Sequence, residues 1–167
     1  MGLIKDVVEK VFSIPKKIEE ITSDETASYL EMDRSIQLDG YSCGVQSAYA
    51  ILNYYGKARS IKNVEKLLGA YDRGYASESA IYKLFRERNL KISKRSKATI
   101  KTIKESIDEY EAPMLTTIDD GAHWIVVYGY SRTNIFVLDS IIYRPFVKWS
   151  KQSFKKRWDN WGAIIYK

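Results

Sequence analysis

The sequence predicts an α+β domain in which helices come first along the chain and an antiparallel sheet follows. Between residues 43 and 107 apolar residues recur at the three- and four-residue spacing of amphipathic helices. From residue 113 onwards they gather in short β-branched and aromatic runs separated by turn residues. Because neighbouring strands joined by short turns pair antiparallel, we expect the helices to pack on one such sheet.

The composition is typical of a single folded domain. The chain has 167 residues, of which 45% are hydrophobic and 13% aromatic. One cysteine excludes an intramolecular disulfide, and one cysteine with one histidine cannot supply a structural zinc set, so we expect neither a metal nor a cofactor. Since no run has the apolar length of a membrane span and the N-terminus lacks a signal peptide, we expect a cytoplasmic protein.

The formal net charge is +6, and basic residues cluster in residues 86–104 and 148–157, the second cluster interleaved with aromatic residues. Such a pattern can indicate a nucleic-acid surface. Here the charges spread over several predicted elements, so we interpret them as solvated faces and expect no nucleic acid as a partner. A basic surface can equally attract an acidic peptide.

Residues 1–34 form the first of two predicted parts, an amphipathic helical arm. A heptad-type stripe, interrupted by Pro15, is formed by Ile4, Val7, Val11, Ile14, Ile18 and Ile21. We expect the arm to pack on the domain's own surface; docking to a protein partner or lying on a membrane surface are the alternatives. Residues 22–33 are a polar connector in which Tyr29 and Leu30 are expected to contact the domain.

Residues 43–56 predict a buried helix that begins at the only cysteine. One helical face carries Val45, Ala48, Tyr49 and Leu52. Gly56 suits the end of the helix, and Asp39, Gly40 and Ser42 are turn and cap residues before it. A lone cysteine is often a core residue. In the first turn, however, free N–H groups and the helix dipole favour the thiolate, so Cys43 suits a nucleophile.

Three more helices and a short strand are predicted before the sheet. Ser60 caps a helix that ends at Gly69, and Ser77 caps a helix that buries the apolar residues between 81 and 85. Residues 91–93 read as a short strand. The third helix begins either at Thr102, which has capping-box spacing, or earlier, at Thr99.

The only histidine, His123, stands at the start of a predicted strand that ends at Gly129. A strand over residues 113–118 precedes it, and a turn followed by residues 135–138 leads to Asp139. In a hairpin centred on that turn, His123 and Asp139 lie near the open end of the two strands, where a carboxylate can orient the imidazole. Asp119 and Asp120 are the alternative carboxylates. The remaining predicted elements are a strand over residues 146–149, a helix over 150–158 and a strand over 162–166.

Gln37, six positions before Cys43, offers an amide group that can stabilise an oxyanion beside the thiol. These residues resemble the papain-like peptidases that process double-glycine leader peptides. The matching stretches are Gln37 with Cys43-Gly44, the helix end Asn53-Tyr54-Tyr55-Gly56, His123-Trp124-Ile125-Val126-Val127-Tyr128-Gly129, and Val137-Leu138-Asp139. The sequence departs from the family at Ser42 and Ser140, where Asp and Pro are frequent.

The resemblance implies a papain-like domain over residues 35–167, with the nucleophile helix packed on a C-terminal antiparallel sheet. It also implies that Cys43 is the nucleophile and His123 the base, that Asp139 orients His123, and that Gln37 helps form the oxyanion hole. Many family members are the N-terminal domain of a membrane transporter. No transmembrane helix or ATPase domain is present here, so we expect a stand-alone domain.

The expected function is thiol-dependent cleavage of a peptide bond, with a Gly-Gly leader as the candidate motif and a peptide or protein substrate as the partner. A glutamine amidase or a transpeptidase uses the same thioester chemistry and is the first alternative. A non-catalytic peptide-binding domain is the second.

Overall fold

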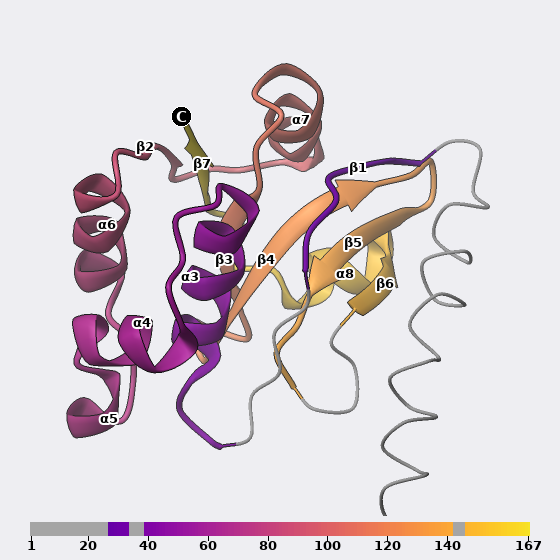
Figure 1. Cartoon of the computed structure of the whole chain (residues 1–167). Helices are drawn as coiled ribbons and strands as arrows, with labels where there is room; N and C mark the ends of the chain where they lie inside the picture. The colour runs from indigo at the N-terminus through magenta and orange to yellow at the C-terminus, as the bar shows by residue number, and fades with distance from the viewer. Residues whose placement is uncertain (1–26, 34–38, 142–145) are drawn as a thin grey trace, which may run out of the picture.

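The computed structural model describes residues 27–33, 39–141 and 146–167, and its architecture is the predicted α+β arrangement (Figure 1). Helices come first in this part of the chain and most strands follow. The strands form one antiparallel sheet of order β2-β7-β3-β4-β5-β6, and β1 pairs with β4. In chain order the described elements are β1 (Ser28–Tyr29), α3 (Cys43–Tyr54), α4 (Ile61–Leu68), α5 (Ala70–Arg73), α6 (Glu78–Glu87), β2 (Lys91–Arg95), α7 (Ile100–Lys104), the π-helix η1 (Glu105–Glu109), β3 (Met114–Ile118), β4 (His123–Tyr130), β5 (Asn134–Leu138), β6 (Phe146–Ser150), α8 (Lys151–Arg157) and β7 (Gly162–Tyr166).

The core lies on both faces of the sheet. Figure 1 shows α3 on one side of β3 and β4, and α8 on the other side of the sheet. The first cluster joins α3, α4 and α6 to the strands through Val45, Ile51, Leu68, Phe85, Leu115, Val126 and Phe136. The second joins α7 and α8 to the opposite face through Ile103, Met114, Ile125, Val137, Phe154 and Trp158. Burial of these apolar side chains is the main force that holds helices and sheet together.

Local capping rules explain where the middle helices begin and end. Ser60 accepts the Asn63 N–H at 3.1 Å at the start of α4, and Gly69 ends that helix in the left-handed region. Ser77 accepts the Ala80 N–H at 3.3 Å at the start of α6. The predictions for these two helices are confirmed. The short helix α5, between the left-handed Gly69 and Gly74, was not predicted because four residues show no periodicity.

The sequence left open whether this helix begins at Thr102 or earlier, at Thr99, and α7 begins directly after Thr99. Thr99 and Thr102 form a reciprocal capping box, so the helix begins after Thr99 and not at Thr102. Beyond Lys104 the helix continues as the π-helix η1. Ile103 and Ile107 are buried and turn inwards.

Strand β1 shows how the residues before position 35 contact the sheet. Ser28 and Tyr29 pair with Tyr130 and Gly129, and the Leu30 N–H donates to the Tyr128 carbonyl at 2.8 Å. The expected contact of Tyr29 and Leu30 with the domain is therefore confirmed. The stripe between residues 4 and 21 lies outside the described residues, and the division of the chain at residue 34 stays a prediction.

Replacing Gly129 with alanine is expected to lower the free energy of unfolding by about 2 kcal/mol, because the new methyl group overpacks the contact between β1 and β4. An added Cβ would lie 2.4 Å from the Tyr29 Cβ and 2.8 Å from Phe136 Cδ2. Thermal unfolding measures the change. Gly40→Ala is the control, because a Cβ there meets no atom within 4 Å. Equal unfolding midpoints for the two variants would contradict the prediction.

Candidate active site

Cys43 is the first residue of α3, as the sequence predicted, and its side chain is half-buried. The loop before it is shaped by Asp39, whose carboxylate accepts the N–H groups of Tyr41 and Ser42 at 2.8 and 2.7 Å. Ser42 occupies the N-cap position, but its buried hydroxyl has no hydrogen-bond partner among the described residues and does not cap the helix. In the part of the chain that the structure describes, the Ser42 side chain therefore leaves the first N–H groups of α3 uncapped, and the positive helix end lies at the sulfur.

Gly44 and Trp124 bring the start of β4 against the start of α3. A Cβ at Gly44 would lie 2.7 Å from the Ala76 Cβ and 3.0 Å from Trp124 Cδ1, so only glycine allows the indole to pack this closely. The Trp124 Nε1–H donates to the Ala76 carbonyl at 3.2 Å, which fixes the ring. Cys43 precedes Gly44 and His123 precedes Trp124, so the contact between Gly44 and Trp124 holds α3 and β4 together beside these two residues.

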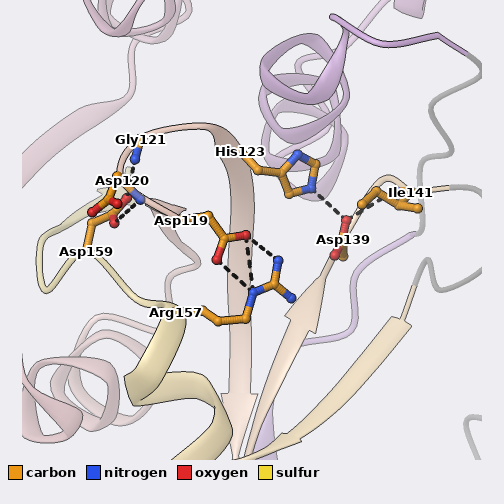
Figure 2. Close-up of polar contacts among 8 residues, drawn as sticks. All are labelled: Asp119, Asp120, Gly121, His123, Asp139, Ile141, Arg157 and Asp159. Carbon is orange, nitrogen blue, oxygen red and sulfur yellow. Dashed lines mark hydrogen bonds and ion pairs between the residues drawn. The ribbon is translucent and has the colours of Figure 1, made fainter.

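His123 and Asp139 lie in direct contact. His123 Nε2 lies 2.7 Å from Asp139 Oδ1, and both side chains are largely buried (Figure 2). The same carboxylate oxygen accepts the Ile141 N–H at 3.1 Å, which holds it in place. Because Nε2 faces Asp139, Nδ1 is the ring nitrogen left to exchange a proton with Cys43.

A β-bulge that the sequence did not reveal sets the register of this pair. Strand β4 has an extra residue between Val127 and Gly129. On the His123 side of this bulge, Val126 lies opposite Leu138. If this register continues by one residue, Asp139 lies opposite Ile125, which is two residues after His123 and therefore on the same face of β4. The alternation of a strand then directs both side chains to the same face. Without the bulge, Asp139 would lie opposite Val126 and point to the other face.

Asp119 and Asp120, the alternative partners of His123, have other contacts. The Asp119 carboxylate forms an ion pair with Arg157, and the Asp120 N–H donates to Asp159 at 2.9 Å (Figure 2). Asp139 is therefore the carboxylate that is hydrogen-bonded to the imidazole. Gln37 lies outside the described residues, so its expected role stays a prediction.

The electrostatics of the site favour a thiolate paired with an imidazolium. Burial raises the pKa of the Cys43 thiol, but hydrogen bonds from His123 and from the Trp124 backbone outweigh it, and the pKa falls below its ordinary value. Burial lowers the pKa of His123, but its hydrogen bonds to Asp139 and Cys43 and their charges outweigh that effect, and the pKa rises to about 9. The lowered pKa of Cys43 favours the thiolate, which is the nucleophilic form, and the raised pKa of His123 favours the imidazolium, which is a proton donor.

A cysteine at a helix start that faces a histidine-carboxylate pair on a sheet defines a papain-like cysteine peptidase. Residues 33–167 match the model of the Peptidase C39 family. The chain belongs to this family and is a cysteine peptidase.

Solved structures show the same fold at low sequence identity. A double glycine motif protease from an AMS/PCAT transporter, solved in complex with the leader peptide, is 17% identical with a TM-score of 0.67, over 83% of this chain and 93% of that chain. The peptidase domain of Streptococcus ComA, a bi-functional ABC transporter, is 17% identical with a TM-score of 0.69, over 81% and 98%. A C39-like peptidase from Bacillus anthracis is 14% identical with a TM-score of 0.65, over 84% and 98%.

None of the curated proteins compared with the chain matches it. Within residues 27–33, 39–141 and 146–167, no helix combines the length and the apolarity that crossing a membrane requires. The same ranges contain no group of three or more His, Cys, Asp or Glu side chains that could hold a metal ion.

Proposed function

We propose that this peptidase cleaves a leader peptide after a Gly-Gly motif, with Cys43, His123 and Asp139 as its catalytic residues. The observation that carries the proposal is the 2.7 Å contact between His123 and Asp139 beside a cysteine of lowered pKa at the start of α3. The family model and the fold shared with a double glycine motif protease support the choice of substrate.

The proposed reaction begins when the Cys43 thiolate attacks the carbonyl carbon of the second glycine. The C–S bond forms, the carbonyl π electrons move to oxygen, and the oxyanion is stabilised by the Cys43 N–H at the start of α3 and by Gln37. When the tetrahedral intermediate collapses, the C–N bond breaks and the His123 imidazolium gives its proton to the leaving amine. A thioester and a neutral imidazole remain.

In the second half of the proposed reaction, His123 acts as a base. It takes a proton from water, and the hydroxide attacks the thioester carbon. The C–S bond then breaks, so the thiolate and the imidazolium form again, and the released leader carboxylic acid loses its proton to solvent. Asp139 keeps one ring nitrogen directed at the reacting atoms through both steps. The proposal includes the cytoplasmic location expected from the sequence, because a nucleophilic thiol persists where thiols stay reduced.

A synthetic peptide with a Gly-Gly leader should be cut once, after the second glycine, and mass spectrometry of the products identifies the bond. Replacing both glycines with alanine should lower kcat/KM at least about 10-fold, because two added methyl groups must fit where none was present. A scrambled peptide of the same composition is the control. Release of ammonia without chain cleavage would contradict the peptidase proposal and favour the amidase.

A further inference from the structure

The turn between β3 and β4 has an unusual backbone conformation. Asp119, Asp120 and Gly121 have φ angles of 58°, 58° and 79°, so three consecutive residues lie in the left-handed region. Two of them carry a Cβ atom, which makes this conformation costly unless surrounding groups stabilise it. His123 begins β4 two residues later, so a change in the turn would move the imidazole.

Asp159 stabilises this turn from the loop between α8 and β7. One carboxylate oxygen accepts the Asp120 N–H and the other accepts the Gly121 N–H, both at 2.9 Å (Figure 2). The second oxygen also accepts the Thr117 hydroxyl at 2.5 Å, which ties the carboxylate to β3. Successive N–H groups in a turn form a concavity that suits an anion, and here the chain fills it with its own carboxylate.

Arg157, the last residue of α8, holds the first residue of the turn. Its Nε donates to the two carboxylate oxygens of Asp119 at 2.8 and 3.2 Å, and its Nη2 completes the ion pair (Figure 2). The Arg157 carbonyl accepts the Asp119 N–H at 2.8 Å. Asp119 is therefore held through both its main chain and its side chain by one residue.

The charges of Asp119 and Arg157 also reach the catalytic pair. Arg157 is the main cause of the lowered pKa of Asp119, and His123 adds to it. Asp119 is the main cause of the raised pKa of Arg157, and Asp139 adds to it. Cys43 on α3 and Asp139 after β5 are thus the charged groups that act most on His123, and His123 also interacts with Asp119 in the turn, whose carboxylate is paired with Arg157.

We propose that Arg157 and Asp159 are positioning residues for His123. Asp159 and Arg157 fix the turn from which β4 begins, and pairing Asp119 with Arg157 presents the imidazole with two charges that offset each other. A lone carboxylate at this place would stabilise the imidazolium, and a lone guanidinium would destabilise it. The inference rests on the proposed function, in which His123 transfers protons to and from the substrate.

The positioning role of Asp159 is tested by Asp159→Ala, assayed with the leader peptide. We expect kcat to fall at least about 10-fold while KM stays within about twofold, because a displaced imidazole impairs proton transfer more than peptide binding. Asp159→Asn, which keeps the shape and one acceptor oxygen, should recover part of kcat. Asp72→Asn, on the exposed face of α5, is the matched control and should leave kcat unchanged. An unchanged kcat in Asp159→Ala would overturn the proposal.

The charge balance is tested without any substrate, through the NMR titration of the only histidine. Asp119→Asn leaves the guanidinium unpaired and should lower the midpoint, whereas Arg157→Gln leaves the carboxylate unpaired and should raise it, each by roughly half a pH unit. The double variant should return close to the wild-type midpoint. Asparagine tolerates the left-handed conformation, so Asp119→Asn retains the turn.

Opposite shifts in the two single variants separate an electrostatic effect from misfolding, which would move both midpoints in one direction. Shifts in the same direction, or none, would overturn the charge-balance part of the proposal. Since the titration involves no peptide, it stands apart from the test of the proposed function. A wild-type protein that cuts no leader peptide contradicts the substrate and leaves the His123 measurement intact.

Discussion

Replacing Cys43 with alanine is expected to lower peptide cleavage by about 10⁴-fold or more, because no other group can form the thioester. Cys43 is the only cysteine, so reaction with iodoacetamide reports on this thiol alone. In the wild-type protein the lowered pKa should keep the thiol reactive at pH 6, at least about 10-fold faster than in the denatured chain, where its pKa is ordinary. Alkylation at several pH values, followed by mass spectrometry, measures the difference.

Denatured wild-type protein is the control for alkylation, because it contains the same thiol without α3 and His123. Cys43→Ser is the control for shape: it keeps a hydroxyl at the helix start but has no readily ionised group, and it should be as inactive as the alanine variant. Full cleavage activity in Cys43→Ala would rule out the proposed mechanism. An alkylation rate that falls with pH as it does in the denatured chain would rule out the thiolate-imidazolium pair.

Replacing Asp139 with asparagine is expected to lower kcat by about 10²- to 10⁴-fold, because the amide neither compensates the imidazolium charge nor selects the same tautomer. The pKa of His123 is expected to fall in the same variant, for the following reason. Burial lowers the pKa of His123, and the contacts with Asp139 and Cys43 raise it to about 9. Without the carboxylate, burial opposes only the contact with Cys43, so the imidazole should titrate at lower pH. The single histidine makes this titration visible by NMR.

Asp72→Asn is again the matched control, since it removes an exposed carboxylate from α5. It should change neither kcat nor the His123 titration. If Asp139→Asn retained the wild-type titration midpoint, the short contact between His123 and Asp139 would not be the source of the raised pKa, and the orienting role proposed for Asp139 would fail.

Local signals in the sequence predicted most of the elements. Ser60, Ser77 and Ser150 each precede a helix and accept an N–H group from its first turn, which is a rule that depends on only a few neighbouring residues. The helix at Cys43 and the strand at His123 followed from periodicity in the same way. The prediction that Cys43 lies on a helix and His123 on a strand of an α+β fold is confirmed.

What the sequence did not reveal depends on contacts between distant residues. The bulge in β4 has no residue signature of its own, although it decides that Asp139 and His123 share a face. The choice among three aspartates was also open, because only the folded chain shows that Arg157 pairs with Asp119 and that Asp159 binds the turn. Arg157 and Asp159 lie more than thirty positions after His123, so no local pattern linked them to it.

The position of β7 has a consequence for how the protein is made. This strand is the last of the described elements in sequence, yet it lies between β2 and β3. While the ribosome is still adding residues before 162, β3 can pair with β4, but β2 has no partner strand, so the nascent chain can only hold an interrupted sheet. Closure of the sheet must wait for long-range pairing, which is the slow kind of folding step. We therefore expect the complete sheet, which includes the strand that begins at His123, to form only after translation has passed β7.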